Sequence, residues 1–187
     1  MIDKDKISKA VDSIIAAIGE NPNREGLKMT PTRIADMYSE LFSGINKDPS
    51  HYFENAFSES HQDLVILSNI EFSSICEHHF LPFFGKAYIS YIPISKTAGA
   101  SKFAECVDIL SKRPQLQERL TAQIANTIYD TINPKGVEVL LQATHMCISM
   151  RGINKVDAKF VTHAIRGEIT ENTLFKEILA TNQDVLH

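Results

Sequence analysis

The sequence predicts an α+β fold on three observations. Apolar residues at helical spacing occupy much of the first sixty positions, and short apolar runs typical of strands begin near position 63. Two further helical stretches separate the second of these runs from the third. Two strands, two helices and two strands make an α+β order, and 187 residues with 43% hydrophobic content suffice for one ordinary domain.

The N-terminal part is expected to form two amphipathic helices. Apolar residues recur at helical spacing over 3–18, and Gly19 supplies a stop signal. A second helix is expected from Thr30, an N-cap type of residue, with Pro31 at the first helical position. It should run to Ser43-Gly44, so the first sixty residues form a peripheral helical segment.

The apolar runs and turn signals locate the remaining elements. Pro93 closes the second run, and a turn signal over 133–136 precedes the third. The expected strands are 64–72, 86–93, 136–144 and 158–169, the helices between the second and third are 101–112 and 115–132, and a short last helix covers 172–180.

Composition limits the class of protein and its partners. The formal net charge is -4, and no basic stripe interleaved with aromatic residues is present, so nucleic acid is not an expected partner. There is no run of 18 apolar residues, and the first ten residues are charged where a signal peptide would be apolar. We therefore expect a cytoplasmic protein without a membrane partner.

Three cysteines, an odd number, favour thiols or metal ligands over a disulfide framework. Cys76 and His79 stand three residues apart, a spacing that one tight turn can wrap around a single ion. Cys147, at the end of the third expected strand, would complete the site. Two sulfurs and one imidazole favour zinc, Zn²⁺, over magnesium or calcium. Cys106 lies in no such cluster and is expected to be a small buried hydrophobe.

Three protein ligands leave one open position on a tetrahedral ion, where a bound water can have a pKa near 7. His78 and His145 flank the predicted ligands and suit proton transfer at such a water, which indicates a hydrolase. Taken singly, each Cys or His is more often a core or surface residue than a ligand. Their concentration in two short clusters favours the metal site.

Six motifs along the chain now point to a known family. They are 23–27 (NREGL), 30–35 (TPTRIA), 76–79 (CEHH), 99–102 (GASK), 113–121 (RPQLQERLT) and 145–152 (HMCISMRG). Together they resemble zinc-dependent GTP cyclohydrolase I of type IA, in order and over nearly the whole chain.

The resemblance implies a tunnelling fold, with an antiparallel four-stranded sheet and two helices between strands two and three. It divides the chain into an N-terminal helical segment, 1–60, and a catalytic domain, 61–187, that act as one functional unit. It also implies a homodecamer with sites between subunits. The family opens the guanine imidazole ring of GTP at C8, releases formate and forms 7,8-dihydroneopterin triphosphate, which feeds tetrahydrofolate and pterin synthesis and one-carbon metabolism.

The resemblance also assigns roles to residues. Cys76, His79 and Cys147 match the zinc ligands, His78 and His145 match the proton-transfer histidines, Glu118 and Gln117 match the guanine site, and Ser101, Lys102, Arg33 and Arg151 match residues near the ribose and phosphates. From the residues alone, Gln117, Glu118 and Arg33 are better explained as solvated helix positions. A carboxylate that accepts two guanine N–H groups would select against bases that lack them.

Three positions depart from the family pattern. Glu105 stands where an arginine usually binds the triphosphate, and Phe160 and His163 stand where relatives carry hydroxyl side chains. The leading hypothesis is a GTP cyclohydrolase I. The alternative is a paralogue that opens a related guanine nucleotide or nucleoside without the full triphosphate, and a non-catalytic binding module with a structural zinc is a third possibility.

Overall fold

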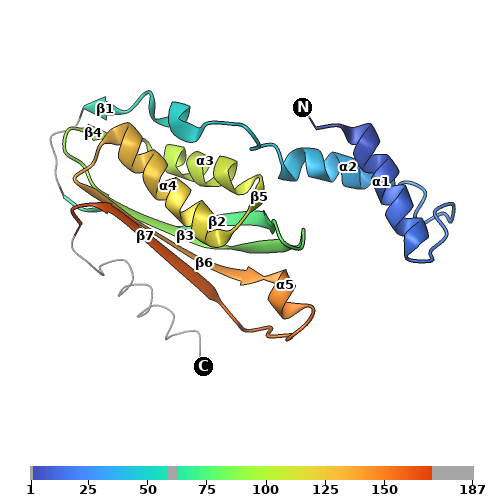
Figure 1. Ribbon diagram of the computed structural model, residues 1–187. Helices are drawn as coiled ribbons and strands as arrows, with labels where there is room; N and C mark the ends of the chain where they lie inside the picture. The colour runs from blue at the N-terminus through green and yellow to red at the C-terminus, as the bar shows by residue number, and fades with distance from the viewer. Residues whose placement is uncertain (1, 59–62, 170–187) are drawn as a thin grey trace.

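The computed structural model describes residues 2–58 and 63–169, which form a helical layer on one face of a sheet (Figure 1). The sheet has the order β5-β2-β3-β6-β7, antiparallel except between β5 and β2. Its strands are β2 (Val65–Cys76), β3 (Pro82–Ile92), β5 (Pro114–Gln115), β6 (Gly136–His145) and β7 (Phe160–Gly167). The predicted α+β class is confirmed, with four long antiparallel strands as a tunnelling fold requires.

Two helices between β3 and β6 cover the sheet, as predicted. They are α3 (Ala100–Ser111) and α4 (Gln117–Ile132), and Figure 1 shows both lying along the same face. Alternate residues of a strand point to one face, so Phe83 and Ile89 of β3 face these helices and are completely buried. Leu120 of α4 is also completely buried, and these side chains belong to one continuous apolar core.

The N-terminal segment forms α1 (Lys4–Ala17) and α2 (Thr30–Leu41), which pack against each other at one end of the molecule (Figure 1). Gly19 ends α1 as predicted, with a left-handed φ of 85° and its N–H donated to a carbonyl of the last turn. The predicted N-cap of the second helix was wrong by one residue, because Met29 is the cap and Thr30 is already helical. A 3-10 turn, η1 (Pro49–Phe53), and the pair β1 (Phe57–Ser58) and β4 (Lys96–Thr97) complete this part.

Strands β2 and β3 are longer than the apolar pattern predicted. β2 continues to Cys76 and β3 begins at Pro82, because the ladder between them persists through Ser73↔Phe84 and Ile75↔Pro82. Ser73 and Ser74 interrupt the apolar run in β2, and Pro82 and Gly85 are poor strand formers in β3, but backbone pairing continues through all of them. This extension carries the strand ends to the predicted metal ligands.

The expected helix at 172–180 lies outside the described residues. Within the described ranges, every helix is too short or too polar to span a membrane.

Candidate metal centre and active site

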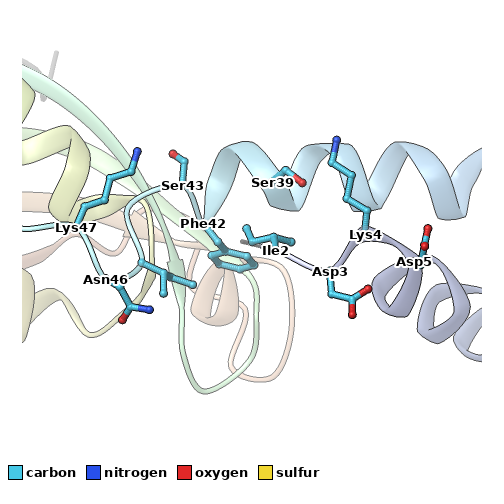
Figure 2. A pocket seen from close by; sticks show the side chains of 10 residues that line it. Ile2, Asp3, Lys4, Asp5, Ser39, Phe42, Ser43, Asn46 and Lys47 are labelled. Atoms are coloured by element: carbon cyan, nitrogen blue, oxygen red, sulfur yellow. The ribbon is translucent and has the colours of Figure 1, made fainter.

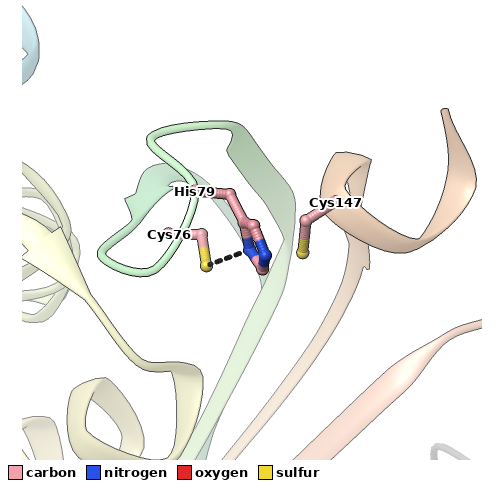
Figure 3. Close-up of side chains that lie close together, drawn as sticks. All are labelled: Cys76, His79 and Cys147. Atoms are coloured by element: carbon pink, nitrogen blue, oxygen red, sulfur yellow. Dashed lines mark hydrogen bonds between the residues drawn. The ribbon is translucent and has the colours of Figure 1, made fainter. Parts of the chain in front are cut away.

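The predicted metal ligands converge at one end of the sheet. Cys76 is the last residue of β2, His79 lies in the turn that follows, and Cys147 lies in the short helix α5 (Met146–Ser149) after β6. Figure 3 shows their side chains pointing toward one another. Their donor atoms all lie within 4.8 Å of one another, and the Cys76 Sγ is 4.0 Å from the His79 Nδ1.

Local backbone structure explains this convergence. The Phe80 N–H donates to the Cys76 carbonyl and the Cys76 N–H donates to the Leu81 carbonyl, both at 2.9 Å, which closes a tight turn around His79. Strand pairing places His145, the last residue of β6, opposite Phe83 of β3. The start of α5 therefore lies beside the turn although the two are far apart in sequence.

The donor set fits a zinc ion. Burial and the neighbouring Cys76 sulfur raise the pKa of the Cys147 thiol, because two thiolates so close together repel each other. A bound dication would reverse this effect by stabilising both thiolates. Two sulfurs and one imidazole nitrogen leave one coordination position for a non-protein ligand.

A hollow of about 160 Å³ opens beside these ligands. It is lined by side chains from the turn, the start of α4, the end of β6 and the start of β7, including Cys76, His78, His79, Gln117, Glu118, His145, Cys147 and Phe160. The structure therefore brings together all predicted metal and proton-transfer residues and the two predicted guanine-site residues. Glu118 is exposed at the N-terminus of α4.

His145 is held on three sides. The Phe83 ring stacks on it, with centroids 4.6 Å apart and planes 7° apart, and the Phe160 ring makes a T-shaped contact with centroids 5.2 Å apart. Its Nε2 lies 2.7 Å from the Oε1 of Gln117. Burial lowers the pKa of His145, and the charge of Glu118 opposes this effect only in part, so the ring is neutral near pH 7.

The sequence did not predict the hydrogen bonds and the ion pair that hold the side chains of this site in place. The Gln117 side chain, expected to face the substrate, is buried and bonded to protein groups of β6 and β7. Arg119 of α4 forms a bidentate ion pair with Glu77, inside the metal-binding turn, with Nη2 to Oε1 at 3.0 Å. Glu77 belongs to the recognised 76–79 motif, but nothing in the sequence indicated its partner.

The predicted phosphate-end residues lie elsewhere in the protomer. Ser101 and Lys102 are in the first turn of α3, whereas the end of α3 leads to β5 beside Cys76. At about 1.5 Å per residue, this helix keeps Lys102 roughly 14 Å from its own C-terminal end. Arg33 is exposed on α2, outside the lining of the hollow. Arg151 is nearer, since its positive charge tends to lower the pKa of Cys147.

Two of the residues that differ from the family pattern, Glu105 and His163, contact side chains of opposite or complementary charge within the chain. Glu105 accepts both of its hydrogen bonds from Lys102, at 3.1 and 2.9 Å. His163 places its Nε2 2.8 Å from Glu138, a carboxylate that is completely buried on the sheet.

A larger hollow, about 860 Å³, lies between the N-terminus and the segment after α2 (Figure 2). Its wall includes Asp3, Phe42 and Lys47 but no cysteine or histidine. Cys106 is excluded from the chemistry, because it is completely buried and desolvation raises its pKa to about 12.

Comparisons with known proteins identify the family of this chain. The chain is 50% identical over 186 residues to a protein of Bacillus subtilis (strain 168) named GTP cyclohydrolase 1, covering 99% of this chain and 95% of the relative. It is 52% identical over 185 residues to a protein of that name from Pelotomaculum thermopropionicum, covering 98% and 95%. Among solved structures, the archaeosine synthase QueF-Like in the apo form aligns with a TM-score of 0.48 at 20% identity, over 60% of this chain and 99% of that one. The family profile described as GTP cyclohydrolase I matches residues 7–183, and this chain belongs to that family.

Proposed function

We propose that this protein is a zinc-dependent GTP cyclohydrolase I, a hydrolase of cyclic amidine bonds. It opens the guanine imidazole ring of GTP at C8, releases formate and yields 7,8-dihydroneopterin triphosphate for tetrahydrofolate synthesis. The observation that carries the proposal is the Cys76, His79 and Cys147 cluster in the same hollow as His145 and Glu118, in a chain of this family.

Cys76, His79 and Cys147 would hold the zinc ion. When bound, zinc supplies a Lewis acid that activates water for attack on a purine carbon. The protein's own residues do the rest. His145, neutral and half-buried, exchanges protons with the purine ring nitrogens, and His78, on the exposed side of the turn, exchanges them with solvent.

Glu118 recognises the base. Its carboxylate lies at the N-terminus of α4, where the helix dipole stabilises negative charge, and it lines the hollow with His145. A carboxylate accepts two N–H donors from the guanine edge, and adenine does not present that pair. Glu118 therefore supplies selectivity for guanine.

The active site is completed by a second subunit of a homo-oligomer, which the family resemblance suggests is a decamer. The support within the protomer is the separation of the predicted phosphate ligands Ser101, Lys102 and Arg33 from the metal cluster. Arg151, on the turn after α5, joins them at the phosphate end. Residues 1–60 and 61–187 act as one unit in this assembly.

We place the protein in the cytoplasm, where reducing conditions keep Cys76 and Cys147 available as thiolate ligands. The alternative of a shorter guanine nucleotide as substrate is not favoured, because relatives about half identical over the whole chain bear the name GTP cyclohydrolase 1. Because these relatives are named as enzymes, the third hypothesis, a non-catalytic binding module with a structural zinc, is also not favoured.

A coupled fluorescence assay of pterin formation tests the proposal, using zinc-loaded protein with GTP, GDP, GMP and guanosine in parallel. We expect efficient turnover of GTP alone. His145→Ala should keep its zinc and lower kcat by about 10²–10⁴, the usual share of a general acid–base group. Efficient turnover of GMP or guanosine, or a His145→Ala variant with full activity, would contradict it.

A further inference from the structure

The side-chain amide of Gln117 occupies a site built from hydrogen-bond acceptors. The residue begins α4 and is only 1% exposed. Its Nε2 lies 3.1 Å from the Leu141 carbonyl oxygen, 3.0 Å from the Phe160 carbonyl oxygen and 3.0 Å from the Thr162 hydroxyl. The two carbonyls can only accept, so the group that faces them must be the NH₂.

The hydroxyl beside this amide is also fixed in direction. Thr121 donates its hydroxyl hydrogen to the main-chain carbonyl of Gln117 at 2.7 Å, and its oxygen lies 2.6 Å from that of Thr162. Because Thr121 has only one hydrogen to give, Thr162 donates to Thr121 and offers no hydrogen to Gln117. All three neighbours of the Gln117 Nε2 are therefore acceptors, and they share its two hydrogens. A flipped amide would place Oε1 against two carbonyl oxygens, so the amide has one orientation.

This orientation determines the protonation of the next side chain. The atom of Gln117 that faces the His145 Nε2, at 2.7 Å, is Oε1, which carries no hydrogen. A hydrogen bond of this length requires the hydrogen to be on Nε2. In the neutral ring, Nδ1 is then the nitrogen with the free lone pair. The same hydrogen bond fixes which way round the ring lies, because turning the ring over would place a carbon opposite Oε1.

We infer that Gln117 is a positioning residue, which fixes His145 in the tautomer protonated at Nε2 so that Nδ1 is the atom that exchanges protons with the substrate. This inference rests on the proposed proton-transfer role of His145. It gives the Gln117 side chain a role other than the substrate binding that the resemblance implied. The role needs an amide, since carboxylate or hydrocarbon side chains cannot both donate to the carbonyls and accept from the ring.

The first test reads the tautomer directly and needs no substrate. Protein labelled with ¹⁵N-histidine is compared by magic-angle-spinning NMR with Gln117→Met, and the His145 signals are identified by their loss in His145→Ala. We expect the wild-type ring to be Nε2-protonated and the variant to show a substantial Nδ1-protonated population. An unchanged tautomer in Gln117→Met would overturn the inference.

Gln115→Met is the matched control. Gln115 is equally buried, two residues away, and donates to the Leu110 carbonyl and to Gln123, with no bond to His145. This variant makes the same chemical change at the same depth, and it should keep the wild-type tautomer. Zinc content and circular dichroism establish that both variants are folded, and Gln117→Asn is a second, smaller polar change should Gln117→Met fail to fold.

Kinetics with GTP separate positioning from binding. For Gln117→Met we expect kcat to fall by about 10²-fold or more, as for loss of acid–base catalysis, while KM changes less than threefold. A tenfold rise in KM with unchanged kcat would instead make Gln117 a direct substrate ligand. If the wild-type protein did not turn over GTP, the proposed function would fail while the NMR result still decided the tautomer.

Discussion

At the scale of single residues, position and not residue type decides what the three cysteines do. Cys76 and Cys147 face a histidine and a solvent-connected hollow, whereas Cys106 lies in the apolar core among the helices. A thiol with a pKa near 12 has almost no thiolate at neutral pH, and only the thiolate binds metal. The chemical difference among the three follows from burial and neighbours.

Zinc retention should therefore separate these cysteines. Cys147→Ala removes a ligand from the cluster, and we expect it to lose zinc on gel filtration in the presence of a weak chelator. Cys106→Ala deletes one buried sulfur at the cost of a small cavity and should keep one zinc per chain. Metal analysis by mass spectrometry measures both. Equal zinc contents in the two variants would show that the metal is held elsewhere.

The metal ligands could be predicted from sequence because Cys76 and His79 are three residues apart, so local geometry alone brings them together. The contacts that position His145 could not be predicted from the sequence. The acceptors that orient Gln117 come from strands 24 to 45 residues away in sequence, and they meet only when β6 and β7 pair beside α4. Such contacts exist only in the assembled sheet.

At the scale of secondary-structure elements, a neighbouring carboxylate explains why His163 can replace the hydroxyl side chain usual in the family. His163 lies on β7, and its partner Glu138 lies on the adjacent strand β6, completely buried and also bonded to Ser90 at 3.2 Å. A buried carboxylate is costly unless hydrogen bonds satisfy it. The imidazole therefore contributes to strand pairing, which explains why a bulkier ring is tolerated there.

A double-mutant cycle tests this pair. His163→Ser, which restores the usual small hydroxyl, should lower the free energy of unfolding by about 1–3 kcal/mol because Glu138 loses a bond in a buried site. In a Glu138→Gln background the same change should cost much less. Thermal unfolding at one fixed protein concentration gives the comparison. Additive effects of the two substitutions would mean that the contact contributes nothing.

The junction between the N-terminal segment and the sheet domain depends on a glycine. The Gly44 N–H donates to the Lys112 carbonyl at 2.8 Å, and a Cβ added at this position would collide with the backbone oxygen of Ile109. Gly44→Ala should therefore destabilise the protein by about 1–3 kcal/mol, as overpacking does. Gly26→Ala is the control, since there the added carbon meets only the mobile end of Arg24. We expect a lower melting temperature for Gly44→Ala than for Gly26→Ala. Equal melting temperatures would argue against a rigid junction.

At the scale of the whole molecule, the residues expected to bind phosphate lie apart from the residues expected to carry out the chemistry. The metal cluster, His145 and Glu118 lie at one end of the sheet, while Lys102 begins the helix that runs toward that end from the other side. The positive charge expected to bind phosphate is therefore displaced along the molecule from the chemistry. A second copy that presents its α3 terminus to this hollow would supply the missing charge.

Subunit complementation tests this arrangement. His145→Ala and Lys102→Ala should each be nearly inactive alone, but co-assembled in equal amounts they should recover about a quarter of wild-type activity. The fraction follows from random assembly, because one site in four draws its intact His145 and its intact Lys102 from different subunits. The control mixes His145→Ala with Glu118→Ala, whose altered residues line the same hollow of one protomer, so every site lacks one of them and no activity should return. If the first mixture stays as inactive as the control, Lys102 does not act across a subunit boundary.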